Sequence, residues 1–560
     1  MTQDIFRRRN QGEEEGTRRK TGTLDGGAAM RIIVPLQGVI QGRGGLVLGF
    51  VAPCALFYFL QLFFRRYRSS SSPPPAPPSR SVSSSQLAVE SETQSQLGSL
   101  VSLRGSSGPA YISSRALSLR KTGNSEYYVG LKEYLDNPYD PVMNPNGVIQ
   151  LGLADNKLTL DLIGEWMSNN MRRSLLGDDE VAPLSMCGIA GYQRFDGLPE
   201  MKYAVAGFMN QVLNGKVSFN PSQIILTAGA TPSIEILSYC LADPGNAFLV
   251  PSPYYPGFDR DIKFRSGVEM IPVPCRSTDS FNISITALDR AYTQAKKRGL
   301  KVRALLLSNP SNPVGNLISR DLWYSLLDFS RERDIHLISD EIFAGSVYGD
   351  GEFVSVAEVL SSGEFDKSRV HIIYGLSKDM CLAGFRVGVL YSYNESVLAA
   401  ATRLARFCPV SAPTQRLMTS MLSDRVFIAQ FLRENRERLT KMHGAFVGGL
   451  KELGIECTKS VGGFYCWADM SHLIRSYSEK GEIELWKKLL YDGGVNVTPG
   501  SSCHSIEPGW FRCCFTMLSE EELGVAMERI RKKSTSFKCM KTFNGMGINS
   551  SETGFHDHGR

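Results

Sequence analysis

The sequence lacks the signals of a metal site and of a repeat architecture. Its 12 cysteines form no Cys-x-x-Cys pair and are scattered through predicted strands and helices, as in proteins of a reducing compartment. No segment is repeated along the 560 residues. The net charge of +6 is small, and much of the basic excess lies in short N-terminal runs such as 7–9 and 18–20. We therefore expect no metal site and no nucleic-acid partner.

One long uncharged hydrophobic run stands near the N-terminus. Residues 45–64 carry no charge over about 20 positions, which is close to the length that crosses a bilayer as a helix. The basic stretch 65–68 follows at once. A membrane anchor is one interpretation, and a hydrophobic patch without function in a disordered extension is the other. A cleaved signal peptide fits less well, because the run starts late and is long.

A chain of this length is too long for one hydrophobic core, so we expect two or more structural units. Its hydrophobic content of 42% is ordinary for a globular protein. Ser/Pro-rich composition predicts an extended, disordered linker from residue 69 to about 115. The predicted units are a disordered extension (1–115), an N-terminal arm with part of a smaller domain (116–195), a large domain (196–425), the main part of the small domain (426–535) and a mobile tail (536–560).

Four apolar runs are each followed by a polar segment, and each run is typical of a buried parallel strand. Because open α/β sheets bind ligands at the carboxyl ends of their strands, we expect the polar segments to meet at one site. The pattern predicts an α/β fold. The runs and the segments that follow them are 223–226 with 227–233, 304–307 with 308–315, 335–338 with 339–343, and 370–374 with 375–379.

The last segment and the residues after it contain the most informative pair, Lys378 and Arg386, which lie eight positions apart. In this setting the pair suggests a site for pyridoxal 5'-phosphate (PLP). The cofactor's aldehyde forms a Schiff base with a lysine amine, and its phosphate needs a cation. A surface lysine and arginine in a loop would be the ordinary interpretation of such a pair alone. The residues of the other three segments favour the cofactor.

Each of those segments offers a group that PLP needs. A buried carboxylate, here Asp340, keeps the pyridine nitrogen protonated, and the amide of Asn312 can donate to the phenolic oxygen. Backbone N–H groups at a helix start, here Ala230 and Thr231, suit the phosphate. The ring of Tyr255 offers a flat partner for the pyridine face. Singly, an Asp after a strand is often a helix cap and Asn-Pro is usually a turn, but their joint occurrence in this order predicts a PLP site.

Three further motifs, 152–158, 253–261 and 509–512, complete the pattern. With them, roughly residues 125–535 resemble the class I/II aminotransferases, which are fold-type-I PLP enzymes. Within that family the chain is similar to the 1-aminocyclopropane-1-carboxylate synthases and their animal relatives. The resemblance implies a large domain with a mostly parallel central sheet and a smaller C-terminal α+β domain. It also implies a homodimer, an amino acid substrate and a cytoplasmic location, with membrane tethering depending on residues 45–64.

The same resemblance implies roles for individual residues. Lys378 and Asp340 would carry the catalysis, and Ser377 would bind the cofactor next to the lysine. Arg512 would grip the α-carboxylate of the substrate in a bidentate pair. Asp155 would lie on the substrate side of the site.

Four residues depart from the family's pattern. Phe343 stands where the family has the tyrosine that bonds the cofactor's phenolic oxygen, so the pKa of the Schiff base should rise. Gly375 replaces the first serine of the motif Ser-x-Ser-Lys. Phe195 stands where a tyrosine reaches into the neighbouring subunit's site, and Asp155 is one methylene shorter than the family's glutamate.

Because of these departures, the sequence supports PLP binding better than it supports the ring-closing reaction of the synthases. Our lead prediction is a PLP-binding, synthase-like protein of amino acid metabolism without efficient activity on S-adenosylmethionine. One alternative is an active aminotransferase or carbon–sulfur β-lyase. The other is a catalytically silent protein that keeps the fold for binding or dimerisation, and Phe343, Gly375 and Phe195 are the residues that favour it.

Overall fold

The computed structural model describes residues 111–546, apart from 122, 124 and 178–188. These residues belong to one unit, Pro109–Arg560. The predicted hydrophobic run 45–64 and nearly all of the predicted linker lie outside the described residues. In the described part of the chain, no helix is both long and apolar enough to cross a membrane.

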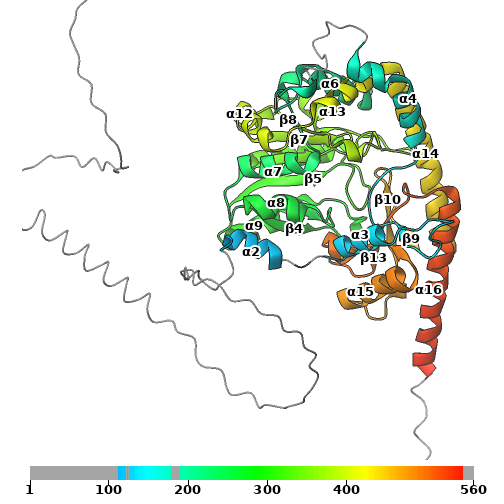
Figure 1. Cartoon of the computed structure of the whole chain (residues 1–560). Helices are drawn as coiled ribbons and strands as arrows, with labels where there is room; N and C mark the ends of the chain where they lie inside the picture. The colour runs from blue at the N-terminus through cyan, green and yellow to red at the C-terminus, as the bar shows by residue number, and fades with distance from the viewer. Residues whose placement is uncertain (1–110, 122, 124, 178–188, 547–560) are drawn as a thin grey trace, which may run out of the picture. The chain divides into compact units, whose positions relative to one another are not determined.

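A seven-stranded sheet forms the centre of this unit (Figure 1). Its strands are β2 (Ile224–Thr227), β3 (Ala247–Ser252), β4 (Glu269–Pro274), β5 (Val302–Ser308), β6 (His336–Asp340), β7 (Val370–Gly375) and β8 (Gly388–Ser392). The order across the sheet is β2-β8-β7-β6-β5-β3-β4. Strand β8 is antiparallel to both neighbours, whereas all other neighbouring pairs are parallel. The expectation of a mostly parallel central sheet is confirmed.

Side chains of the central strands alternate between two buried faces. In β5, Leu305 and Leu307 join one apolar core, whereas Ala304 and Leu306 join the core on the opposite face. All four side chains are 0–1% exposed. A strand that is buried on both faces has a continuous apolar sequence, which is why the apolar runs predicted β2, β5, β6 and β7. Strand β2, expected as a parallel strand, pairs in the described sheet only with β8 and is antiparallel to it.

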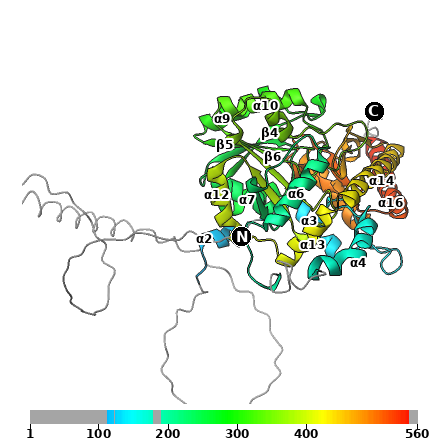
Figure 2. The same cartoon turned by 90° about the horizontal axis from the view of Figure 1, so that it is seen from above.

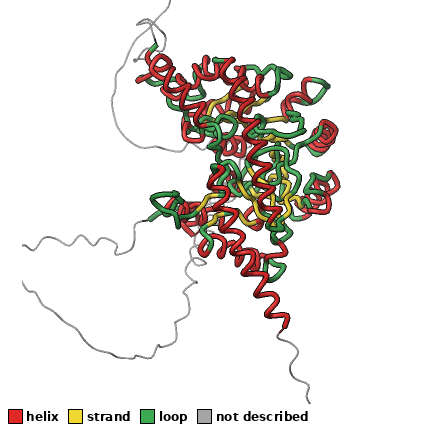
Figure 3. Tube along the Cα trace, turned by 90° about the vertical axis from the view of Figure 1, so that its right-hand side faces the viewer, coloured by secondary structure: helices red, strands yellow, loops and turns green. Residues whose placement is uncertain are grey.

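Helices cover both faces of the sheet (Figures 1 and 2). The helices up to residue 423 are α2 (Ser114–Lys121), α3 (Glu126–Asp136), α4 (Leu160–Leu176), α6 (Pro199–Val212), α7 (Ala230–Leu241), α8 (Phe258–Ser266), α9 (Ile285–Lys297), α10 (Arg320–Glu332), α11 (Val356–Ser361), α12 (Glu395–Leu404) and α13 (Ala412–Ser423). Helices α7, α8 and α12 supply side chains to one core, and α6, α9, α10 and α13 to the other. Figure 3 shows the strands enclosed by helices.

The C-terminal part of the chain forms a second, smaller sheet. Its elements are α14 (Arg425–Glu452), β9 (Glu456–Cys457), β10 (Tyr465–Asp469), α15 (Glu479–Lys487), β11 (Val495–Asn496), β12 (Thr498–Pro499), β13 (Trp510–Cys514) and α16 (Glu520–Met546). Four of the strands pair antiparallel in the order β12-β13-β10-β9. Strand β1 (Ile149–Gln150) pairs parallel with β11, so the segment that precedes α4 is joined to this C-terminal part.

Helix α14 belongs to both halves of the unit. Its residues Ile428 and Phe431 join a core of the large sheet, whereas Leu439 and Phe446 join the core of the small sheet. The predicted domain boundary at residue 425 coincides with the start of this helix. Because the helix contributes to both cores, its start does not separate them. The division into a large and a small domain at this residue stays a prediction. The predicted boundary at residue 535 falls within α16.

Candidate functional site

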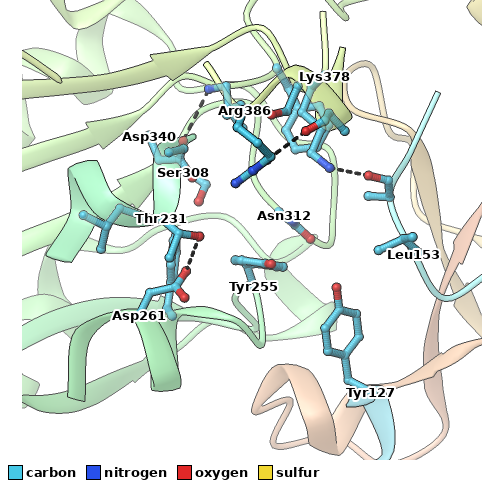
Figure 4. A pocket seen from close by; sticks show the side chains of 18 residues that line it. Tyr127, Leu153, Thr231, Tyr255, Asp261, Ser308, Asn312, Asp340, Lys378 and Arg386 are labelled. Atoms are coloured by element: carbon cyan, nitrogen blue, oxygen red, sulfur yellow. Dashed lines mark hydrogen bonds between the residues drawn. The ribbon is translucent and has the colours of Figure 1, made fainter. Parts of the chain in front are cut away.

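A cavity of about 200 Å³ lies at the carboxyl ends of the central strands. Its walls come from the start of α7, from α8 and from the segments that follow β5, β6 and β7 (Figure 4). The structure brings all eight residues that the sequence assigns to PLP into this wall: Ala230, Thr231, Tyr255, Asn312, Asp340, Ser377, Lys378 and Arg386. Among the described residues, no group of histidine, cysteine and acidic side chains is arranged to hold a metal ion.

Lys378 lies in the turn that follows β7 and points into the cavity. Its amine donates a hydrogen bond to the backbone carbonyl of Ala154. Burial lowers the pKa of Lys378 below its usual range, although the nearby Asp155 carboxylate opposes this effect. A lysine with a lowered pKa is more often neutral, and a neutral amine is the form that attacks an aldehyde or accepts a proton.

Asp340 is the last residue of β6 and is only 9% exposed. Burial raises its pKa to about 7, and a backbone hydrogen bond from Ile342 to its Oδ1 (3.4 Å) partly opposes the increase. The carboxyl group has no salt-bridge partner within the described chain. A cation placed beside it would favour the charged carboxylate, so Asp340 suits a protonated ring nitrogen.

Arg386 lies against the start of α7, on the opposite wall from Tyr255 (Figure 4). Its guanidinium donates to the backbone oxygens of Ala383 (2.9 Å) and Ala228 (3.2 Å). A Cβ on Gly229, whose φ is +95°, would lie 2.2 Å from Nη2 of Arg386. Only glycine therefore leaves room for the guanidinium beside the helix start, where backbone N–H groups and the helix dipole favour an anion.

Asn312 couples the cavity to Arg512. The Nη1 group of Arg512 donates to Oδ1 of Asn312 (2.9 Å), and Nη2 donates to the carbonyl oxygen of Gly152 (2.6 Å). Because the amide oxygen of Asn312 faces this donor, its NH2 group is left to face the cavity. Arg512 does not line the cavity itself, but it is fully buried, and its Nε has no hydrogen-bond partner among the residues that the structure describes.

Three polar residues of the wall were not predicted from the sequence: Tyr127, Asp261 and Ser308. Ser308 ends β5, and Asp261 belongs to the motif 253–261. The sequence position of both residues could therefore have indicated that they belong to the site. Asp261 accepts a hydrogen bond from Thr231 (3.4 Å), and burial raises its pKa to about 6. Tyr127 comes from α3, and its ring lies 5.5 Å from the Arg512 guanidinium. No local sequence pattern connects Tyr127 with the site.

Comparison with known families places this site in context. A family model described as aminotransferase class I and II matches residues 148–530. The chain belongs to this family. The match runs from the segment around β1 into α16 and so includes both sheets and the whole strand-end part of the cavity.

Individual relatives of this aminotransferase-family chain are close. The 1-aminocyclopropane-1-carboxylate synthase 6 of Oryza sativa subsp. japonica is 60% identical over 519 residues, which are 92% of this chain and 94% of that protein. Probable aminotransferase ACS12 of Arabidopsis thaliana is 53% identical over 512 residues, which are 91% of this chain and 100% of that protein. An aspartate aminotransferase double mutant of Thermus thermophilus has a similar fold, with a TM-score of 0.60 at 21% identity over 76% of this chain and 100% of its own.

Class I and II aminotransferases depend on PLP, and PLP is the cofactor of this family member. The residues present fit the group. Arg386 and the start of α7 form an anion site with a glycine in contact with the guanidinium. Asp340 offers a buried carboxyl group, and Lys378 offers an amine whose pKa is lowered. The resemblance seen in the sequence to the 1-aminocyclopropane-1-carboxylate synthases is likewise confirmed by the relatives.

The departures from the family pattern occupy different places. Phe343 lines the cavity, and its ring centroid lies 6.0 Å from Nζ of Lys378. Gly375 pairs with Gly388 at the end of β7, and a Cβ there would lie 2.8 Å from a backbone oxygen of Val387. The position of Gly375 is therefore too crowded for a larger side chain without a backbone shift.

The remaining two departures do not line the cavity. The carboxylate of Asp155 accepts a hydrogen bond from the backbone N–H of Asn156 (3.0 Å). Phe195 is not part of the cavity wall, and its ring centroid lies 5.4 Å from the guanidinium carbon of Arg406. Within one chain, Phe195 therefore does not contact the cavity.

Proposed function

We propose that this synthase-like PLP protein is an active enzyme whose main reaction is amino-group exchange on an α-amino acid. The observation that supports the proposal is the convergence of Lys378, Asp340 and Asn312 on one buried cavity. Each would meet one functional group of PLP. Since burial lowers the pKa of the Lys378 amine, the site offers a candidate base as well as a binding surface.

Residues from several parts of the large sheet's edge would hold the cofactor. Arg386 and the backbone N–H groups of Ala230 and Thr231 would bind the phosphate. Asp340 would accept a hydrogen bond from the ring nitrogen, and the amide of Asn312 would donate to the phenolic oxygen. Tyr255 would cover one face of the ring, with Ser377 beside the phosphate.

When bound, PLP withdraws electrons from the α-carbon of an amino acid, which makes the α-proton acidic. The chain's own task is then to move that proton. Lys378 would accept it and return it at a different atom, and its lowered pKa favours the accepting form. The carbonyl of Ala154, which accepts a hydrogen bond from the amine, would hold the amine in the cavity between these steps.

Arg512 would bind the α-carboxylate of the substrate. Its guanidinium is buried, and the partners that it has among the described residues are neutral oxygens, those of Asn312, Gly152 and Thr498. No carboxylate within the described chain forms a salt bridge with it. A buried cation without a counter-charge is costly, and a substrate carboxylate at the free Nε would supply that charge.

Amino-group exchange is favoured over ring closure by two residues. Ring closure depends on side chains set closely around the substrate, and the shorter Asp155 does not line the cavity. At the same time Phe343 supplies no hydroxyl to the cofactor. Exchange needs only a base, a ring-nitrogen partner and a carboxylate grip, which Lys378, Asp340 and Arg512 would provide.

We further propose a cytosolic homodimer. Members of this family are typically dimers. Near Phe195, the side chains of Tyr192 and Phe407 are 99% and 74% exposed, which supports a subunit contact there. The nine cysteines whose side chains are described are free thiols, which supports a reducing compartment.

The test uses the full chain purified with PLP. Borohydride reduction should fix the cofactor to a peptide that contains Lys378, and Lys378→Ala should abolish the label. A panel of α-amino acids should then change the visible absorbance and yield the corresponding keto acids. Absence of the label would refute cofactor attachment. A label without any spectral change or product would instead identify a silent protein.

A further inference from the structure

A cluster of hydrogen bonds around Asp379 joins two turns of the site. Asp379 follows Lys378 directly and is fully buried. Its Oδ2 accepts from the hydroxyl of Tyr374 (2.6 Å) and from the backbone N–H of Gly345 (2.7 Å). Its Oδ1 accepts from the hydroxyl of Ser346 (2.6 Å). One carboxylate thus binds the turn after β6 to both the end of β7 and the turn that follows it.

These two turns frame the cavity. The turn after β6 contributes Ile342 and Phe343 to the wall, and the turn after β7 contributes Ser377 and Lys378. The amine of Lys378 lies 6.0 Å from the ring centroid of Phe343. The distance between the amine and residue 343 therefore depends on how the two turns pack together.

The packing of the turns is close. A Cβ on Gly345 would lie 3.0 Å from Cγ of Asp379, so the turn after β6 rests directly on the carboxylate. Burial raises the pKa of Asp379 to about 6, while the hydrogen bonds from Ser346, Tyr374 and Gly345 act in the opposite direction. Above that pH the group is a buried anion, and its three donors are what stabilise it.

We propose that Asp379 is a positioning residue that fixes the Lys378 amine relative to residue 343 and so to the cofactor. This inference rests on the proposed attachment of PLP to Lys378. Asp379 does not line the cavity, so it acts through the lysine turn and does not touch the substrate. Misplacement of a reacting group by about 1 Å can cost on the order of 100-fold in rate.

The test variant is Asp379→Asn, which has nearly the same shape. Its amide has one accepting oxygen and one donating nitrogen, so it cannot accept from Tyr374, Ser346 and Gly345 together. We expect kcat to fall about 10- to 100-fold with little change in KM. We also expect the pKa of the linkage between Lys378 and PLP, read from its absorbance, to move by about 0.5 or more.

Two further variants separate positioning from loss of stability. Glu358→Gln removes another buried carboxylate. Glu358 lies on α11, pairs with Arg320 of α10 and does not line the cavity. The variant should lower the thermal midpoint and leave both kcat and the absorbance titration unchanged. Tyr374→Phe removes a single donor to Asp379 and should shift kcat and the titration in the same direction as Asp379→Asn, by less. If Asp379→Asn does not fold, Tyr374→Phe alone tests the positioning role of Asp379.

The outcomes of the two proposals can be told apart. If borohydride labels Lys378 in the unmodified chain, but kcat and the titration are unchanged in Asp379→Asn and Tyr374→Phe, the positioning role is overturned and the proposed function stands. If the unmodified chain carries no label at Lys378, both proposals fail. A changed titration in the Asp379 and Tyr374 variants, with an unchanged one in Glu358→Gln, supports the role of Asp379.

Discussion

At residue 343 the cavity wall has an aromatic ring but no hydroxyl. The ring packs edge-to-face against Phe464 and Tyr465, at 5.1 and 5.6 Å between centroids. We predict that Phe343→Tyr lowers the pKa of the Schiff base between Lys378 and PLP by about 1, because a hydrogen bond to the phenolate favours the deprotonated imine. A spectrophotometric pH titration of the two coloured forms measures this.

Phe343→Leu is the matched control, because it changes the packing but adds no hydroxyl. It should leave the Schiff-base pKa where it is or raise it. An equal decrease of the Schiff-base pKa in both variants would show that packing, and not the hydroxyl, controls this pKa. An unchanged pKa in Phe343→Tyr would mean that a hydroxyl at this position does not reach the cofactor.

Single residues also show how far sequence reasoning reaches. Lys378, Asp340 and Asn312 were predicted because each follows an apolar strand, and parallel strands bring their carboxyl ends to one edge. Tyr127 was not predicted, since it comes from a helix outside the sheet and reaches the cavity only through tertiary packing. Arg512 and Asn312 were both predicted as site residues. Their contact could not be predicted, because the two residues lie far apart in the sequence.

At the scale of elements, continuous apolar runs predicted the central strands because burial on both faces removes the alternation of polar and apolar residues. The two-residue strands β1, β11 and β12 could not be predicted in the same way. A strand of that length has no period, and its pairing depends on the rest of the fold. The membership of helix α14 in two cores depends on tertiary packing, which no local sequence pattern reports.

Helix α14 also carries a half-buried histidine that should make the protein sensitive to acid. Burial lowers the pKa of His443 to about 4. Its ring lies 4.8 Å from that of Tyr348, and its Nε2 lies 3.2 Å from the hydroxyl of Ser460. The unfolded chain keeps an ordinary histidine pKa near 6.5 and so binds the proton more readily. Acid therefore shifts the equilibrium toward unfolding as the pH falls from about 6.5 to about 4.

We predict that His443→Gln removes this part of the acid sensitivity. Between pH 7 and pH 5 the free energy of unfolding of the unmodified chain should fall by about 2 kcal/mol more than that of the variant. Urea denaturation at the two pH values measures the difference. At pH 8 the histidine is neutral in both the folded and the unfolded chain. The free energies of unfolding of the two proteins should then differ only by the effect of the lost packing. Parallel decreases in both proteins would contradict the assignment to His443.

At the scale of the whole molecule, shared architecture does not decide the reaction. The chain is 60% identical to a protein named as a synthase and 53% identical to one named as a probable aminotransferase. Both kinds of chemistry start from the same cofactor, the same base and the same carboxylate grip. We therefore expect the outcome to depend on side chains near the rest of the substrate. Our candidate is Asp155, which follows the wall residue Ala154 and is one methylene shorter than the glutamate of the family pattern.

The last prediction follows from this difference. The carboxylate of Asp155 is withdrawn by one methylene, about 1.5 Å at covalent bond lengths, and a displacement of about 1 Å can cost on the order of 100-fold in rate. With S-adenosylmethionine, the full chain should therefore form 1-aminocyclopropane-1-carboxylate at least about 10-fold more slowly than it exchanges the amino group of its best amino acid substrate. Asp155→Glu should raise the cyclised product and leave the exchange reaction nearly unchanged, because exchange does not use that carboxylate. Chromatography of both products decides between the reactions. Cyclised product formed faster than any keto acid by the unmodified chain would show that Asp155 serves ring closure and that the protein is a synthase.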